Sequence, residues 1–118
     1  MSFPGKLKRL TILGEAVYRG SDRVAEQPWI DRLATAADQL DLEAETVSVA
    51  RDLYLSELPV EDRSKPALLA ASCYTATLIS GDERSQSAVA NAFDVSRIAI
   101  QQRWKALLED AGMSPPRW

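Results

Sequence analysis

A sixteen-residue stretch without a charged side chain, Pro66 to Gly81, places the strongest constraint on the fold of this chain. Charged residues make up 26% of the whole sequence, so an uncharged run of this length predicts a segment enclosed by other elements. Pro66 suits the first turn of a helix, and Gly81 suits the left-handed position that ends one. At about 1.5 Å per residue, such a helix is too short to cross a bilayer. The run therefore predicts a central buried helix, 66–80, in an all-α domain.

The amino-acid composition argues against several classes of function. A chain of 118 residues is the size of one domain, and its net charge of −3 argues against a protein that coats nucleic acid indiscriminately. There is no histidine, and Cys73 is the single cysteine, so we expect no metal site, no cofactor and no enzymatic activity. The N-terminal residues MSFPGKLKRL lack the apolar core of a secretory signal, so we expect a cytoplasmic protein.

Helical spacing predicts three elements before the central helix. Apolar residues recur at helical spacing between 6 and 19, which predicts a helix that ends at a break around Gly20. This helix would belong to an N-terminal extension, 1–28. A second apolar stripe predicts a helix from Trp29 to Leu40. Asp41 is expected to cap the third helix, which is expected to bury Val47, Ala50, Tyr54 and Leu58.

Two further helices are expected after the central one. Ser85 can cap a short helix, Asp94 to Ser96 form a turn, and Ser96 can cap a last helix that continues to Asp110. Gly112 is expected to end that helix, and residues 112–118 are expected to be a flexible tail. A helical domain over 29–111 follows, with the N-terminal extension before it.

The segment QSAVANAFDVSRIAIQQRWKAL, within 85–109, has the spacing of a helix-turn-helix. Ala90 is small where the two helices would cross, and Asp94 stands at the turn position that requires a left-handed backbone. Ile100 would anchor the second helix. The residues expected to be exposed at the start of that helix are Arg97, Ile98, Gln101 and Gln102, whose side chains suit base edges and thymine methyl groups.

Positive charge is concentrated in one segment of the chain. From Arg84 to Lys105 there are four cations and one anion, which leaves +3, so the other residues sum to −6. A basic face on an acidic body is typical of directed contact with nucleic acid. The same spacing also fits a helical hairpin whose last helix only packs and keeps its charges in water, and this alternative stays open.

The run from DRSKPALLAASCYTATL through SQSAVANAFDVSRIAIQQRWKALL resembles one cyclin-like repeat of archaeal transcription factor B, the counterpart of eukaryotic transcription initiation factor IIB. The resemblance extends from about Trp29 to Asp110. Its most specific parts are Ser64-Lys65-Pro66 before a helix that contains Tyr74, the opening at Ser85-Gln86, and Val95-Ser96 followed by Arg103-Trp104-Lys105. It implies a five-helix cyclin-like fold with a C-terminal helix-turn-helix.

The resemblance also implies binding to double-stranded promoter DNA beside the TATA-binding protein. In the family, base contacts come from an apolar residue and an Arg three positions later, which correspond to Ile98 and Gln101 here. Gln101 departs from Arg, so a different sequence preference is expected. The candidate DNA-contacting residues are Ser85, Gln86, Ser96, Arg97, Ile98, Gln101, Gln102, Arg103 and Lys105.

The chain departs from the family in two larger respects. One cysteine cannot form the family's N-terminal zinc ribbon, and a single repeat is present where the family has two. We therefore expect a transcription regulator with a single repeat, as a monomer or a homodimer, that has no membrane association. The alternative is a cyclin-like protein-interaction module without direct DNA binding.

Overall fold

The structure is a computed structural model that describes residues 20–113, and its regular secondary structure in that range is entirely helical. The predicted all-α class is confirmed. The expected helix at 6–19 and the residues from 114 to Trp118 lie outside the described residues. The elements are α1 (Gly20–Leu40), α2 (Ala44–Ser56), a 3₁₀ turn η2 (Asp62–Ser64), α3 (Lys65–Ser80), α4 (Gln86–Phe93), α5 (Arg97–Gln101) and α6 (Trp104–Asp110).

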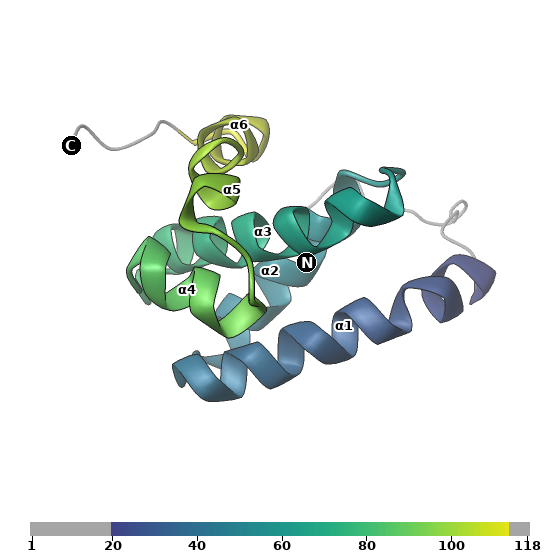
Figure 1. The fold of residues 1–118 in the computed structure, drawn as a ribbon, viewed down its shortest axis with the longest axis horizontal. Helices are drawn as coiled ribbons and strands as arrows, with labels where there is room; N and C mark the ends of the chain where they lie inside the picture. The colour runs from purple at the N-terminus through teal and green to yellow at the C-terminus, as the bar shows by residue number, and fades with distance from the viewer. Residues whose placement is uncertain (1–19, 114–118) are drawn as a thin grey trace.

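Helix α3 is the centre of the domain. Its buried residues run without interruption from Leu68 to Thr77, and it contacts every other α-helix among the described residues. Figure 1 shows α3 in the middle of the molecule, with α1 and α4 on one side and α5 and α6 on the other. Pro66 lies in its first turn, and Gly81 ends it with φ of 75°. The central buried helix predicted at 66–80 is therefore confirmed, one residue longer at its start.

Two buried threonine hydroxyls on α3 are satisfied by the backbone of the same helix. Thr75 Oγ1 donates to the Ala71 carbonyl at 2.8 Å, and Thr77 Oγ1 donates to the Tyr74 carbonyl at 2.6 Å. Small and hydroxyl side chains let neighbouring helices approach closely on all sides. Nowhere between residues 20 and 113 is a helix both long and apolar enough to cross a membrane.

Four of these helices end in the same way. Their last turn is followed by a residue with positive φ, and the next amide donates to the carbonyl five residues back, as in a Schellman closure. The left-handed residues are Asp41, Gly81, Asp94 and Gly112. The prediction that Asp41 caps the third helix is wrong, because this residue closes α1 instead. Helix α2 begins after Glu43, whose side chain makes no capping hydrogen bond.

Helix α1 begins earlier than the sequence pattern indicates. The expected break around Gly20 is wrong, since α1 starts at this residue and includes Pro28. Within the earlier part, Glu26 is buried and accepts hydrogen bonds from the Tyr54 hydroxyl at 2.7 Å and the Lys65 ammonium at 3.0 Å. These contacts hold the segment before Trp29 against α2 and α3. The boundary placed between residues 28 and 29 therefore falls inside a helix.

Helix α2 buries only part of the predicted set of residues. Ala50 and Tyr54 are buried as predicted, but Val47 and Leu58 are only partly buried. Thr46 takes a fully buried place instead, because its hydroxyl is within 2.7 Å of the Ser80 hydroxyl and donates to Asp82 Oδ2 at 3.1 Å. A polar side chain with both partners in place can be buried at low cost.

The last predicted helix is interrupted. The expectation of one continuous helix from Ser96 to Asp110 is wrong, because α5 ends at Gln101 and α6 begins at Trp104. Between them, the Arg103 amide donates to the Ile100 carbonyl three residues back, and Arg103 has φ of −122°. Thr75 Oγ1 also donates to the Trp104 carbonyl at 3.4 Å. The change of direction lets both short helices pack against α3.

Candidate nucleic-acid interface

The first helix of the candidate interface is α4. The Ser85 hydroxyl accepts a hydrogen bond from the Ala88 amide at 3.0 Å, which caps the helix as predicted. Val89, Ala90 and Phe93 are buried, so one face of this eight-residue helix packs into the core. Ala90 is 3% exposed, which agrees with the prediction that a small residue is needed there.

A tight turn follows α4. Asp94 has φ of 57° and ψ of 44°, the left-handed conformation that the sequence spacing predicts at this position. The Val95 amide donates to the Ala90 carbonyl at 3.0 Å, and the Val95 side chain packs against the core. The chain therefore changes direction within three residues, and α5 follows with one side exposed at the surface.

Helix α5 has an anchored side and an open side. The Ser96 hydroxyl caps it by accepting from the Ala99 amide at 3.2 Å, and Ile100 is fully buried. The side chains that remain exposed form what we call the α5 outer face, which consists of Arg97, Ile98, Gln101 and Gln102. Ile98 is 63% exposed, and exposure of so much apolar surface contributes nothing to folding of the described domain. The anchored side fixes which residues face outward.

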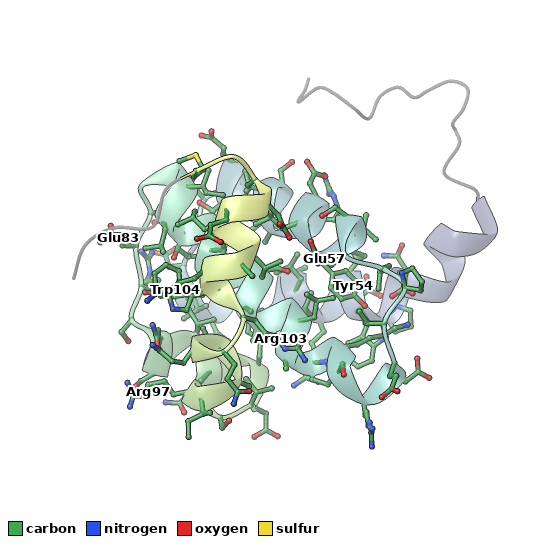
Figure 2. The ribbon with its side chains drawn as sticks, turned by 90° about the horizontal axis from the view of Figure 1, so that it is seen from above. Tyr54, Glu57, Glu83, Arg97, Arg103 and Trp104 are labelled. Carbon is green, nitrogen blue, oxygen red and sulfur yellow. The ribbon has the colours of Figure 1, made fainter. Side chains whose placement is uncertain are left out.

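The cations near α5 differ in their surroundings. Arg97 and Lys105 are exposed, whereas Arg103 is partly buried at the break between α5 and α6. The Lys105 ammonium lies 5.7 Å from the centroid of the Trp104 ring, a cation–π distance. In Figure 2, Arg97 lies near the outer edge of the molecule, and Arg103 and Trp104 lie at the start of α6.

The structure separates the predicted contact residues into groups. Ser96 and the α5 outer face lie together on one surface, with Arg103 and Lys105 close along the chain. Ser85 is exposed but stands at the opposite end of α4, and its hydroxyl already serves as a cap. Gln86 is partly buried, with its side-chain oxygen enclosed. Ser85 and Gln86 are therefore not brought together with the α5 outer face.

Arg84 is counted in the positive charge of this segment, but its side chain is not directed toward α5. It contributes to the local +3, but its guanidinium donates to the carbonyl oxygens of Leu40 and Asp41, each at 2.9 Å, and to Asp82 Oδ1 at 2.9 Å. Its donors are therefore directed at the end of α1. The cations that remain near the α5 outer face are Arg97, Arg103 and Lys105.

Other reactive groups are absent from this surface. Cys73 is buried in α3, and burial raises the pKa of its thiol to about 12, so the thiolate is not available at neutral pH. Within residues 20–113, no group of three or more acidic, cysteine or histidine side chains is arranged to hold a metal ion. The surface offers hydrogen-bond donors, amide groups, an apolar side chain and positive charge.

Comparison with known proteins gives a partial match. No family model matches this chain. It is similar to proteins named transcription initiation factor IIB from Pyrococcus horikoshii and Pyrococcus abyssi, with 30% identity over 84 residues in each case. The match covers 68% of this chain and 28% of each relative, so the chain spans less than a third of the length of these relatives. The similarity indicates a relationship to transcription factors of this type.

Proposed function

We propose that this domain acts in transcription regulation by binding double-stranded promoter DNA, with α4 and α5 as a helix-turn-helix and α5 in the major groove. The observation that carries the proposal is the α5 outer face, where the 63% exposed Ile98 lies among Arg97, Gln101 and Gln102. Arg donates to base edges, Gln both donates to and accepts from them, and an isoleucine can contact a thymine methyl group. The similarity to transcription initiation factor IIB supports the same function class.

In this proposal the cations beyond the outer face hold the DNA backbone. Lys105 is exposed, and Arg103 lies at the break where the chain leaves α5. Phosphate contacts from these residues would fix the register of α5, whereas Ile98 and Gln101 would read bases. Contact with the TATA-binding protein, which the family resemblance implies, is part of the same proposal and would occur while α5 is in the groove.

A protein-interaction module is the second candidate. The observation that favours it is the acidity of the chain outside the Arg84–Lys105 segment, which sums to −6 and repels DNA that approaches from other directions. In that case the exposed Ile98 would contact a protein partner, and the helix-turn-helix would be only a scaffold. Binding to a partner through an apolar surface should vary little with salt, whereas DNA binding should weaken steeply.

The test begins with selection of a preferred duplex from a random pool, followed by titration of the selected and a scrambled duplex at several salt concentrations. The two phosphate contacts, from Arg103 and Lys105, predict a slope of log K against log salt of about −2. Lys105→Gln should flatten this slope by about 0.9 and weaken both duplexes equally. Gln101→Ala should reduce discrimination by about 1–3 kcal/mol at one base pair and leave the scrambled duplex unaffected.

The matched control is Arg51→Gln. Arg51 is exposed on α2, and among the hydrogen bonds of the described residues its side chain donates only to the Ser48 hydroxyl. Its replacement removes one positive charge, as Lys105→Gln does, at a position away from α5. DNA affinity and salt slope should stay at the wild-type values in this variant. Absence of any duplex binding tighter than about 10 µM at low salt would rule out the proposed function.

A further inference from the structure

Two arginines that lie outside the α5 outer face link α1 to the chain at the two ends of α4. At its start, Arg84 immediately precedes the capping residue Ser85 and donates to the Leu40 and Asp41 carbonyls, each at 2.9 Å. Those carbonyls belong to the end of α1, where backbone acceptors lack partners within the helix. A guanidinium at a helix C-terminus is also favoured by the helix dipole. The start of α4 is therefore tied to the end of α1.

The loop before α4 is tied to α2 by the same cluster. Asp82 Oδ1 accepts from Arg84 at 2.9 Å, while Asp82 Oδ2 accepts from the Glu43 amide at 2.9 Å and from Thr46 Oγ1 at 3.1 Å. The hydrogen bond from the Glu43 amide is the main reason that the pKa of Asp82 is lowered, so the carboxylate is ionised at neutral pH. The Asp82 carboxylate thus links the loop after α3 to the start of α2 and to Arg84, which in turn contacts the end of α1.

At the other end of α4, the Arg32 guanidinium donates from Nη2 to the backbone carbonyl of Phe93, the last residue of the helix. Arg32 comes from the middle of α1 and is partly buried. Phe93 immediately precedes Asp94, the left-handed residue that starts the turn into α5. The cation therefore lies at the point where the chain changes direction toward the candidate interface.

The two contacts have similar spacing. Arg32 to Leu40 is a step of eight residues along α1, and Arg84 to Phe93 is a step of nine residues that includes the eight residues of α4, so about 12 Å of each helix lies between the contacts. Because Arg32 contacts the end of α4 and Leu40 contacts Arg84, just before its start, the two helices run antiparallel. Figure 1 shows α4 beside the C-terminal half of α1.

We propose that Arg32 and Arg84 form a bracket that holds both ends of α4 against α1 and thereby sets the orientation of the turn and the α5 outer face. Helix α4 has eight residues, which is too short to be stable without such support. Arg32 is a positioning residue in this proposal and does not contact DNA. The effect on DNA binding rests on the proposed function, but the effect on the turn does not.

The test compares amide hydrogen exchange and DNA binding in Arg32→Gln and wild-type protein. Loss of the charged donor should open the end of α4, so exchange at the Asp94 and Val95 amides should be about tenfold faster, while amides in α2 and α3 stay unchanged. Affinity for the selected duplex should fall about fivefold or more, with the scrambled-duplex affinity and the salt slope unchanged. Arg32→Lys keeps a cation and a donor, and should recover much of both losses.

Arg51→Gln is again the control for the loss of one positive charge, and it should change neither readout. Unchanged exchange at Asp94 and Val95 in Arg32→Gln, together with equal weakening of both duplexes and a flatter salt slope, would show that Arg32 is a phosphate contact and overturn the bracket. If wild-type protein binds no duplex, the proposed function fails, and the exchange measurement still decides the bracket. If Arg32→Gln does not fold, Arg32→Lys replaces it, because its shorter donor should restore the contact only in part: exchange faster than in wild type and confined to the turn supports the bracket, and unchanged or uniformly faster exchange overturns it.

Discussion

The Tyr74 and Trp104 rings pack edge to face, with 5.6 Å between their centroids and an angle of 84° between their planes. Tyr74 lies in the central helix and Trp104 is the first residue of α6, so this pair joins the core to the segment that follows the candidate interface. Thr75 adds a hydrogen bond to the Trp104 carbonyl. The position of α5 therefore depends on how firmly α6 is held.

Truncation of the indole should be strongly destabilising. Trp104 is 2% exposed, so Trp104→Ala should lower the free energy of unfolding by about 3–5 kcal/mol, as for other large core truncations. Trp104→Phe keeps an aromatic ring against Tyr74 and should cost less. Denaturant unfolding measures both values. A loss below about 1 kcal/mol in the alanine variant would contradict the packing described for α6.

The ion pair between Lys65 and Glu26 should be costly to break from one side. Their side chains are only 12% and 10% exposed, and the Tyr54 hydroxyl also donates to Glu26. Lys65→Met leaves a carboxylate enclosed without its cation, and should lower stability by about 3 kcal/mol. The double variant Lys65→Met with Glu26→Leu should recover much of that loss. Denaturant unfolding of the double variant and of both single variants, Lys65→Met and Glu26→Leu, measures the coupling, and simple additivity would argue against it.

Glu57 should make stability depend on pH. Burial raises its pKa above the ordinary value of 4.5, and the nearby Asp110 carboxylate raises it further. The folded state therefore binds this proton more tightly than the unfolded chain, so the ionised group opposes folding above the folded pKa. This penalty should disappear as pH falls through the folded pKa toward the unfolded value.

The corresponding variant is Glu57→Gln, which should raise the melting temperature at about pH 7 and have little effect near about pH 4. Glu109→Gln changes an exposed carboxylate on the same helix as Asp110 and serves as the control. Melting temperatures measured across this range decide the sign. Destabilisation by Glu57→Gln at neutral pH would show that the ionised carboxylate is stabilising instead.

Replacement of the turn residue should stabilise the domain. Asp94 holds a left-handed backbone, which glycine adopts without steric cost, so Asp94→Gly should raise the free energy of unfolding by up to about 1 kcal/mol. Asp41→Gly makes the same change at the end of α1, where φ is also 57°, and should behave alike. Thermal and denaturant unfolding check both variants. Destabilisation at Asp94 alone would indicate that its side chain has a role in the turn.

Features encoded by neighbouring residues could be predicted from the sequence. The uncharged run gives the central helix, Ser85 and Ser96 give the caps, and Asp94 with Ile100 gives the turn and the exposed side of α5. The break between α5 and α6 could not be predicted. Ile100, Trp104 and Leu108 recur every four residues, as they would in a straight helix, and no proline or glycine marks the interruption.

The roles of the arginines could not be predicted for a different reason. Arg32 and Arg84 donate to backbone carbonyls in segments far away in the chain, and a carbonyl carries no sequence signal. Counting Arg84 as part of a DNA-binding charge therefore overestimates the positive charge near α5. The buried Glu26 presents the same difficulty, because its partners Tyr54 and Lys65 belong to other helices.

The most direct test of the central claim is chemical-shift mapping by NMR with the selected duplex. If the α5 outer face enters the groove, the largest changes should fall on the amides from Ser96 to Arg103 and on the methyl groups of Ile98, with little change along the acidic exposed face of α1 at Asp31 and Asp38. Changes confined to α1 and α2, or no changes at a duplex concentration that saturates binding, would contradict the assignment of α5 as the DNA-reading helix.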